Sequence, residues 1–489
     1  MYDIDNIIGC YCTTFNIQLY VIQFYWGAIP MWDLRIINTD KSLYIAIADA
    51  IERDIRLGIL KAGEKLPAQR GLAKKVGVNV TTITRAYTEA EKRGLVTSII
   101  GSGTYISSDL GYNSSLLNTE KNNSKLIELG LVLPLCAMEP DLNEILERVI
   151  HKNELKDFMG YTPPQGLYRH RLVGSKWVKG FGISAEPDHI VITAGAQHAL
   201  NCIFSSVFQP GDRIAVDCMT YPGVKTAARL CGIQLEAVEM DDEGITPQSL
   251  SAVCHRHNIK GVYTVSTMQN PTNAIMSEQR RSSIAEIIKQ NHLLLIEDDL
   301  YRFLSPENSV PLTALIPEQS IYIAGISKAF YAGLRISFVV TPSKYYNRIS
   351  QAVVDTLWMA PSLNAEIACE CISSGLADQI IALKRNEIQQ RASFLHSKLS
   401  EYYLRYIPDS MFAWLKLPND WSSSEFEKAA NANGVNVVSS EKFTIGGIVP
   451  PNFIRISLTG ADHITEFEKG LDILIKLLNR EIGTAGGLL

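Results

Sequence analysis

Cysteine is scarce in this sequence and does not form a metal-binding pattern. The chain has nine cysteines among 489 residues, an odd number at irregular spacings. Neither of the close pairs, Cys10/Cys12 and Cys369/Cys371, has a second pair at the spacing of a zinc site. We therefore expect reduced thiols in the cytoplasm rather than a disulfide-stabilised secreted fold, and we assign no residue to a metal.

A membrane-spanning or secretory segment is also lacking, although residues 6–32 carry no charge. Two aspartates precede this stretch where a signal peptide would have basic residues, and polar side chains such as Asn16 and Gln18 interrupt it. We expect no membrane association. We interpret residues 1–40 as an N-terminal extension that results from an over-long start-site assignment, with Met31 as the alternative start.

An excess of charge is absent from the chain as a whole but present in one region. The formal net charge is −5, whereas residues 41–107 carry eleven lysines and arginines against six aspartates and glutamates. A chain of this length is expected to form two or three domains. A small basic region within a weakly acidic chain is typical of a domain that contacts nucleic acid.

Residues 41–107 have the pattern of three short helices followed by a hairpin. Apolar residues at every fourth position from Leu43 predict the first helix, and Pro67 and Gly77 mark the start and the end of the second. The third helix is predicted over residues 80–93, and a glycine-rich turn after it predicts a β-hairpin. This arrangement is a winged helix-turn-helix.

The third helix of such a domain enters the major groove of DNA. We expect Thr81, Thr82 and Arg85 on this helix to face the bases. Arg70 and Lys74 on the second helix are expected to contact phosphates. The alternative is a small helical protein-interaction module whose charged face is merely solvated.

The GntR-type DNA-binding domain resembles this region along its whole length. The similarity is carried by LPAQRGLAKKVGVNVTTITRAYTEAEKRGLV at residues 66–96, followed by GSGTY at 101–105. It implies binding to double-stranded operator DNA, with Gly103 of the wing among the contacting residues. Val80 stands where many relatives carry arginine, so the bases that are read differ.

Residues 108–125 are rich in asparagine and serine and lack a sustained period, which predicts a flexible linker. The remainder, 126–489, contains seven short β-branched runs, most of them separated by helix-length segments. This pattern predicts an α/β fold with a mainly parallel seven-stranded sheet covered on both faces. The runs are HIVIT (189–193), DRIAV (212–216), QLEAV (234–238), GVYTV (261–265), HLLLI (292–296), SIYIA (320–324) and RISFVV (335–340).

Polar and glycine residues follow several of these strands, at the edge where open α/β sheets bind ligands. Taken singly, each has a structural explanation such as a turn, a helix cap or a solvated surface position. Their coincidence at one edge predicts a binding site. They are Gly195, Ala196, Gln197, Tyr221, Asn270, Asp298, Tyr301 and Lys328.

These residues have the chemistry to bind pyridoxal 5′-phosphate. The amine of Lys328 can form a Schiff base with an aldehyde, and the carboxylate of Asp298 can pair with a protonated pyridine nitrogen. Backbone N–H groups of residues 195–197 open a helix and would bind a phosphate, with Arg335 adding positive charge. An aromatic ring such as Tyr221 can stack on the pyridine. Asn270 and Tyr301 would then donate hydrogen bonds to the ring hydroxyl oxygen.

Class I aminotransferases of fold type I resemble residues 160–460. The motifs occur in the family's order: TAGAQHAL, YPG at 221–223, NPTN, EDDLYRFL, SKAFYAGLR and FIRISL. The resemblance implies that Lys328 is the catalytic Schiff-base lysine and that Arg455 binds a substrate carboxylate. The alternative for Arg455 is an ordinary charged position on a strand of a small C-terminal α/β subdomain, which a helix at 465–480 closes.

The segment YTPPQG resembles the one whose tyrosine, here Tyr161, reaches the cofactor phosphate of a neighbouring subunit, which implies a homodimer. Two positions depart from the family pattern. Gly325 stands where relatives have serine or threonine, and Asn273 stands in NPTN where NPTG is commoner. Neither change removes a group needed to hold the cofactor.

A winged helix fused to an aminotransferase-like domain is similar to the MocR/GabR subgroup of GntR-type regulators, from about residue 41 to the end. The resemblance implies a pyridoxal-phosphate-dependent transcriptional regulator that senses an amino-acid or amine effector. The alternative is an active aminotransferase, transferring an amino group from an amino acid to a 2-oxo acid, with a DNA-binding appendage. A third hypothesis retains the fold without the cofactor.

Overall fold

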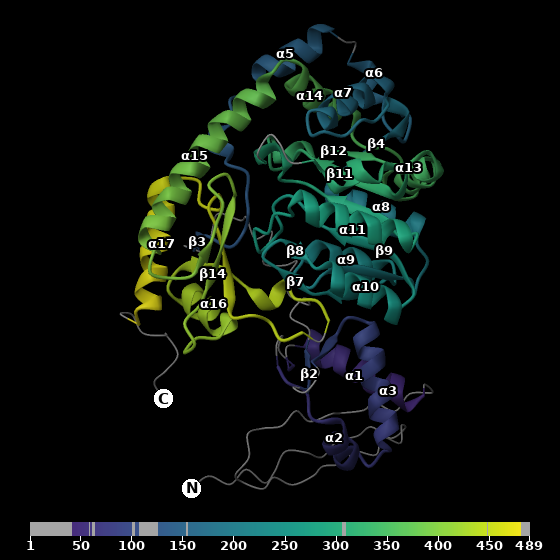
Figure 1. The fold of residues 1–489 in the computed structure, drawn as a ribbon, viewed down its shortest axis with the longest axis vertical. Coiled ribbons are helices and arrows are strands. Elements are labelled where there is room, and N and C mark those ends of the chain that lie inside the picture. The colour runs from purple at the N-terminus through teal and green to yellow at the C-terminus, as the bar shows by residue number, and fades with distance from the viewer. Residues whose placement is uncertain are drawn as a thin grey trace, which may run out of the picture.

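A small N-terminal winged helix and a larger α/β part make up the described chain (Figure 1). The computed structural model describes residues 42–480 except 58, 61–63, 100–102, 107–125, 153–154, 306–309 and 447. The interpretations of residues 1–40, of Cys10/Cys12 and of the linker at 108–125 concern residues outside this range. In the part that is described, no helix has the length and apolar character needed to cross a bilayer.

The winged helix consists of α1 (Leu43–Arg56), α2 (Gln69–Val76), α3 (Val80–Lys92) and the hairpin of β1 (Val96–Ile99) and β2 (Gly103–Ile106). Helix α2 begins at Gln69 rather than at the predicted Pro67, and it ends at a glycine with φ 73°. The apolar faces of the three helices and the hairpin form one core. This core includes Ile47, Ile51, Leu72, Ile83, Tyr87 and Ile106.

Seven strands form the large sheet in the order β4-β12-β11-β10-β9-β5-β6. Strand β12 is antiparallel to both of its neighbours, and the other neighbouring strands are parallel. All seven predicted β-branched runs belong to this sheet, which confirms the expected mainly parallel α/β fold. The bounds are β4 Ile190–Thr193, β5 Arg213–Asp217, β6 Gln234–Val238, β9 Ile259–Thr264, β10 Leu294–Asp298, β11 Ser320–Gly325 and β12 Ser337–Val340.

Helices cover both faces of this sheet because successive side chains of a strand point to opposite faces. In β4, Val191 packs in a core with α8, α9 and α13, whereas Ile190 and Ile192 pack with α7 and α14. Helices α10 and α11 cover the part of the second face nearer to β5 and β9. The bounds are α7 Tyr168–Lys179, α8 Ala196–Val207, α9 Pro222–Leu230, α10 Pro247–Arg256, α11 Glu278–Gln290, α13 Ser343–Leu357 and α14 Ser362–Ser373.

A small subdomain contains a four-stranded sheet in the order β13-β14-β17-β16. The long helix α15 (Leu376–Lys398) runs from α14 along this subdomain (Figure 1). The strand β3 (Ile127–Glu128) pairs with β15 (Val435–Asn436), so the segment that follows the linker region lies against the subdomain. Its other elements are β13 Leu404–Arg405, β14 Phe412–Lys416, α16 Ser423–Ala432, β16 Val438–Ser439, β17 Phe453–Ser457 and α17 Ile464–Leu478.

Shorter elements fill the connections between these parts. They are α5 Asn143–Lys152, α6 Lys156–Met159, β7 Met240–Asp241, β8 Gly244–Ile245, the 3-10 turn η4 Arg302–Leu304 and α12 Leu312–Leu315. The turn η4 begins directly after Tyr301, shortly after the carboxyl end of β10.

Candidate functional site

The predicted site residues meet at the carboxyl edge of the large sheet, where it faces the small subdomain. Asp298 is the last residue of β10, and Lys328 follows the end of β11. Gly195 and Tyr221 are the N-caps of α8 and α9, which follow β4 and β5. Parallel strands bring these positions together because all their carboxyl ends lie at one edge.

Lys328 is half-buried, and its amine donates a hydrogen bond to the carbonyl of Val132. Burial, and after it the nearby positive charges of Arg455, Arg335 and Lys384, lower the pKa of Lys328 to about 8. About a tenth of the amine is therefore neutral at pH 7, far more than in an ordinary lysine, as a nucleophilic lysine requires.

Asp298 is buried with one of its two carboxylate oxygens unused. Tyr263 donates to Oδ2 over 3.0 Å, whereas Oδ1 is buried without a hydrogen-bond partner in the described structure. Burial raises the pKa of Asp298 to about 7, partly offset by the Tyr263 bond. An unsatisfied buried acceptor is costly, so this position suits a ligand with a polar N–H, such as a protonated pyridine nitrogen.

The three consecutive acids at the end of β10 have different partners. Glu297 accepts from the backbone N–H groups of Leu312 and Thr313 and so holds the start of α12. Asp299 accepts from Tyr322, which packs on one face of the sheet, whereas Tyr263 beside Asp298 packs on the other. Asp298 is thus the acid that lies on the same face as Tyr221.

The start of α8 and Arg335 form a cradle for an anion. Gly195 has φ 85°, and a Cβ atom there would lie 2.3 Å from Nη2 of Arg335, so only glycine allows the guanidinium this approach. Arg335 donates to Oγ of Ser327 over 2.9 Å. The first N–H groups of α8, those of Ala196 and Gln197, lack intrahelical acceptors, and together with the arginine they suit a phosphate.

Residues in the first turns of α8 and α9 fix the position of the Tyr221 ring. Its hydroxyl donates to Oε1 of Gln197 over 3.3 Å, and Nε2 of Gln197 donates to the carbonyl of Gly223 over 3.0 Å. A Cβ atom at Gly223 would lie 2.1 Å from the tyrosine ring. The Gln197 side chain therefore orients Tyr221, while its backbone N–H belongs to the anion cradle.

Arg455 is buried and contacts another of the predicted site residues, Asn270, and its role in binding a substrate carboxylate stays a prediction. Its guanidinium donates to Oδ1 of Asn270 and to the carbonyl of Gly130, each over 2.7 Å. It is 4% exposed, and the rings of Phe443 and Phe412 lie 4.8 and 5.7 Å away. Because the amide oxygen of Asn270 is used here, its NH₂ group is the end that can donate to a ligand.

The two remaining predicted tyrosines, Tyr301 and Tyr161, differ in their burial. Tyr301 is buried with its ring edge against Phe412 at 5.3 Å between centroids. Tyr161 is 82% exposed and packs against the exposed Trp358, with ring centroids 5.1 Å apart. The structure of one chain does not bring Tyr161 to the crevice, and its contribution to a neighbouring subunit stays a prediction.

Both departures from the family pattern have a physical explanation. A Cβ atom at Gly325 would lie 3.2 Å from Cγ of Leu300, so leucine occupies the space that a larger residue would need. Asn273 has φ 59°, a left-handed conformation that asparagine tolerates. Its amide donates to the carbonyl of Phe412 and accepts from Ser410, both over 2.7 Å, and so joins this loop to the small subdomain.

Sequence reasoning missed several groups that build the site. The hydroxyl of Tyr263 could have been found, because a tyrosine inside a fully buried strand usually has a partner for its hydroxyl. Ser327 directly precedes the lysine and holds Arg335. The carbonyls of Gly130 and Val132 have no signature in the sequence, since any residue supplies a carbonyl.

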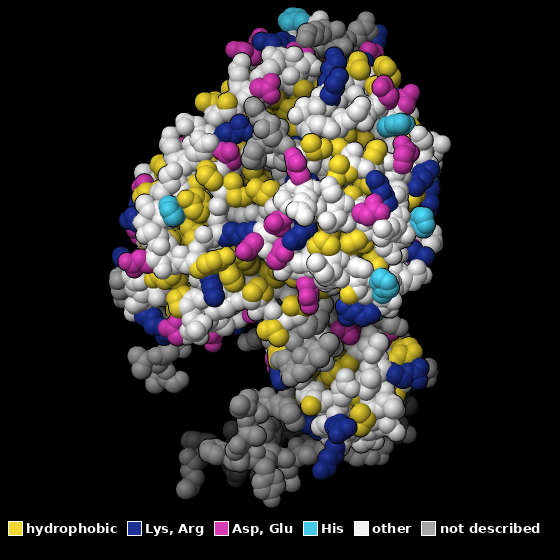
Figure 2. Space-filling view, viewed as in Figure 1, with side chains coloured by type: hydrophobic (Ala, Val, Ile, Leu, Met, Phe, Trp, Pro, Cys, Tyr) yellow, Lys and Arg dark blue, Asp and Glu magenta, His cyan; other side chains and the backbone are white. Residues whose placement is uncertain are grey.

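The predicted DNA-contacting residues lie on the surface of the winged helix. Thr81, Arg85, Arg70 and Lys74 are exposed, as is Gly103 with φ 126°, and Thr82 is half-buried. Figure 2 shows basic side chains at the lower end of this part.

Two local contacts bear on how α3 would present these side chains. Asn79 caps α3 by accepting from the backbone N–H of Thr81 over 3.0 Å and from its hydroxyl over 2.9 Å. The guanidinium of Arg85 lies 4.5 Å from the centre of the Tyr44 ring. Arg85 would have to leave this ring to reach a base.

Known proteins resemble the chain in both of its parts. The family "Aminotransferase class I and II" matches residues 132–468, and "Bacterial regulatory proteins, gntR family" matches residues 43–106. YdeF of Bacillus subtilis, an uncharacterized HTH-type transcriptional regulator, is 34% identical over 451 residues, covering 92% of this chain and 97% of its own length. PdxR of Corynebacterium glutamicum, an HTH-type pyridoxine biosynthesis transcriptional regulator, is 26% identical over 309 residues, covering 62% and 66%.

Solved structures resemble the larger part. An archaeal alanine:glyoxylate aminotransferase aligns with a TM-score of 0.70 at 25% identity, covering 77% of this chain and 95% of its own.

Proposed function

The chain belongs to the class I and II aminotransferase family and carries a gntR-family DNA-binding domain, and from these two assignments we propose that it is a pyridoxal 5′-phosphate-dependent transcriptional regulator. The observation that supports this most strongly is the similarity to an HTH-type transcriptional regulator over 92% of the chain. In this proposal the protein is a cytoplasmic homodimer that binds double-stranded operator DNA and an amino-acid or amine effector.

Five features of the crevice support pyridoxal phosphate as the cofactor. When bound, this group supplies an aldehyde that reacts with amines and a ring that accepts electrons. Lys328 would hold the aldehyde end, Asp298 would pair with the ring nitrogen through Oδ1, and Tyr221 would stack on the ring. The start of α8 and Arg335 bind the phosphate.

Arg455 selects the effector in this proposal. A buried guanidinium pairs strongly with a carboxylate because little water screens the two charges. The effector carboxylate replaces the carbonyl of Gly130 on Nη2, while Asn270 stays on Nη1. The Lys328 amine lies close enough for Arg455 to lower its pKa, so an amino group and a carboxylate on one small molecule reach both residues.

Regulation follows from linkage between the two parts. An effector that binds one conformation of the aminotransferase-like part better shifts the molecule toward that conformation, and operator affinity changes with it. Reciprocity then requires operator DNA to change the affinity for the effector by the same factor.

The second candidate function is an active aminotransferase. It is favoured by the lowered pKa of Lys328, since a lysine with a pKa of about 8 can also move a proton once its amine is released. Steady-state transfer to a 2-oxo acid at about 1 to 1000 per second would support this candidate. Stoichiometric transfer or none, with ligand-dependent DNA binding, supports the regulator.

A combined DNA-binding and cofactor experiment tests the proposal. Fluorescence anisotropy against the DNA upstream of the chain's own gene, with and without pyridoxal phosphate and each candidate amino acid, should give an operator affinity that depends on both. Borohydride reduction followed by peptide mass spectrometry should place the cofactor on Lys328, and Lys328→Ala should lose the visible absorption band.

Arg455→Gln provides a matched control for these measurements. It should retain the band but lose the response to amino acids. An operator affinity that is the same with and without the cofactor and the amino acids would overturn the regulatory proposal. A protein that stays colourless after reconstitution with pyridoxal phosphate would overturn the cofactor assignment.

A further inference from the structure

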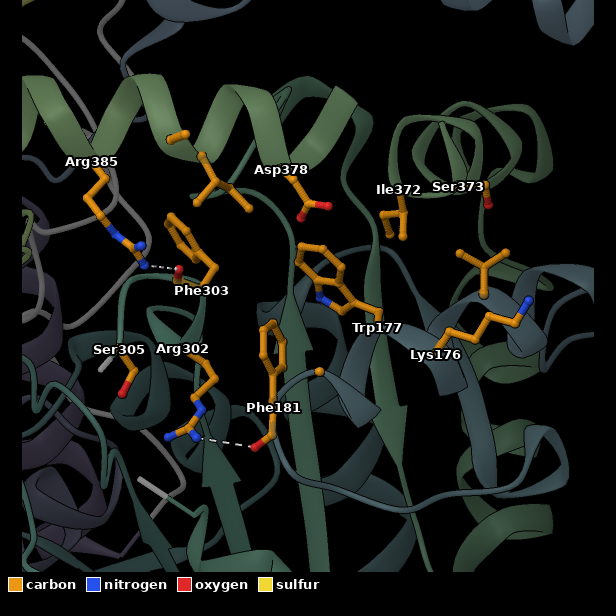
Figure 3. Close-up of a pocket in the computed structure, with 14 residues that line it drawn as sticks. Lys176, Trp177, Phe181, Arg302, Phe303, Ser305, Ile372, Ser373, Asp378 and Arg385 are labelled. Atoms are coloured by element: carbon orange, nitrogen blue, oxygen red, sulfur yellow. Dashed lines mark hydrogen bonds between the residues drawn. The ribbon is translucent and has the colours of Figure 1, made fainter. Parts of the chain in front are cut away.

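A second cavity lies beside α15, apart from the crevice described above. Its volume is about 710 Å³, within the range of ordinary ligand sites. Residues of α7, α14, α15 and η4 line it, and none of the predicted cofactor or effector residues is among them. Figure 3 shows Arg385 coming from α15 and Arg302 from η4, with Phe181 beside Arg302 and Trp177 further away, toward Asp378.

The charge of the lining is predominantly positive. Among the described residues that line it, Arg302, Arg385 and Lys176 are basic and Asp378 is acidic. Figure 3 shows Asp378 near the indole of Trp177, with Arg385 further along α15. An anion therefore finds its best position at the Arg385 end of the cavity.

Arg385 has hydrogen-bonding capacity left over at this end. Its Nη2 donates to the carbonyl of Phe303 over 3.0 Å, whereas its Nε is buried and meets no hydrogen-bond acceptor among the described residues. Asp409 forms an ion pair with Arg385 at 4.0 Å from Nε, a distance too long for a hydrogen bond. A carboxylate can accept from two N–H groups of one guanidinium, and in this side chain, which is 39% exposed, the terminal groups Nη1 and Nη2 are the ones that a ligand reaches.

The rest of the lining is aromatic and apolar. The ring of Trp177 packs edge-on against Phe181, with centroids 5.2 Å apart, and Phe303 lies next to Arg385. Flat rings suit such walls because they bury apolar area and can stack or pack edge-on. The cavity thus has a cationic end and an aromatic body.

We propose that this cavity binds a small aromatic carboxylate, with the carboxylate on Arg385 and the ring beside Trp177 and Phe181. The ligand and the site are distinct from the amino-acid effector and the crevice. The two sites share α15, because Lys384, the residue before Arg385, pairs with Glu139, which also accepts from the backbone N–H of Tyr331 close to Lys328.

Calorimetric titration of the cofactor-loaded full chain with 2-naphthoate tests the proposal, with 2-naphthamide as the uncharged match. We expect 2-naphthoate to bind with a Kd of about 1 mM or below, as its size allows, and 2-naphthamide at least about tenfold more weakly. Arg385→Gln should weaken naphthoate binding about tenfold. Lys398→Gln, on the same helix but paired with Asp472, should leave it unchanged.

Two further variants distinguish binding in this cavity from binding in the crevice. Ala382→Trp, at an exposed lining position of α15, fills the cavity and should block binding even if Arg385→Gln does not fold. Arg455→Gln should not affect the naphthoate titration, because that arginine belongs to the crevice. Equal affinity in wild type, Arg385→Gln and Ala382→Trp would overturn the proposal, as would loss of binding in Arg455→Gln alone.

Discussion

The amine of Lys328 lies near three other positively charged side chains. Arg455 and Arg335 would each bind an anionic group of a ligand, and Lys384 belongs to a buried ion pair behind them. Bringing three positive charges near a fourth makes protonation of Lys328 unfavourable, and burial acts in the same direction. The arginines that we propose to bind the ligand would therefore also increase the neutral fraction of the amine that reacts with it.

Cofactor uptake should depend on pH with an inflection near 8. The folded-state pKa of Lys328 is lowered from 10.5 to about 8, so half of the amine is in the reactive neutral form at about pH 8 and nearly all of it about two pH units higher. Stopped-flow absorbance of the apoprotein mixed with pyridoxal phosphate should show a rate that is half-maximal at about pH 8 and levels off about two pH units above it. Pyridoxine 5′-phosphate, which lacks the aldehyde, serves as the control for simple phosphate binding. An inflection near pH 10.5 would contradict this account.

At the scale of single elements, α3 presents its polar face while Asn79 secures its first turn. Thr81 uses its hydroxyl on Asn79, and Arg85 rests on Tyr44. If Arg85 contacts a base as predicted, it exchanges an aromatic contact for that one.

Arg85→Ala and Lys74→Ala should differ in their effects on DNA binding. Loss of a base contact at Arg85 should weaken operator binding by about 1–3 kcal/mol and relax the preference at one base pair. Loss of a phosphate contact at Lys74 should weaken all sequences alike and reduce the slope of log K against log salt by about 1. Anisotropy titrations at several salt concentrations measure both, with Lys260→Ala as a charge control on the other part. If neither variant changes binding to any DNA, α3 does not enter the groove.

A buried ion pair joins α15 to the segment that precedes α5. The Lys384 side chain is 0% exposed and lies 2.6 Å from Oε1 of Glu139, which is 8% exposed. Lys384→Met should lower the free energy of unfolding of the larger part by about 3 kcal/mol, because it leaves Glu139 buried without its counter-charge. Glu139→Gln combined with Lys384→Met should recover most of the loss, since glutamine still accepts from Tyr331. Urea unfolding followed by far-UV circular dichroism measures the three proteins.

The large sheet could be predicted from the sequence because buried parallel strands are local apolar runs, and their carboxyl ends place Asp298 and Lys328 without further knowledge. The small subdomain is different. Strands such as β13 and β16 have two residues each, too few to show a period. Likewise, the Gly130 carbonyl reaches Arg455 across 325 positions of sequence. Such contacts depend on tertiary packing and on backbone atoms, which the pattern of residue types does not record.

At the scale of the whole molecule, α9 connects the crevice with the winged helix. Tyr221 caps its start, and Arg229 near its end lies against Gly94, where a Cβ atom would be 2.7 Å from the arginine Cδ. Gly94 lies between α3 and β1. This contact predicts that a shift of α9 at the Tyr221 end would reach the segment between α3 and β1.

Arg229→Ser should reduce the coupling between the two parts while both still bind their own ligands. The ratio of operator affinities with and without pyridoxal phosphate, measured by anisotropy, should move toward 1. Arg256→Ser, an exposed arginine at the end of the next helix that bonds to the carbonyl of Ala252 in that helix, should leave the ratio as in the wild type. An unchanged ratio in Arg229→Ser would mean that the contact carries no coupling.

The crevice residues are far apart in the sequence, so the winged helix is synthesised well before the crevice is complete. The winged helix has its own core and is complete at residue 106, whereas Arg455 emerges from the ribosome last of the crevice residues. At about 5–20 residues per second, roughly 20 to 70 seconds separate the two. A nascent or prematurely terminated chain can therefore display the winged helix before the crevice is complete.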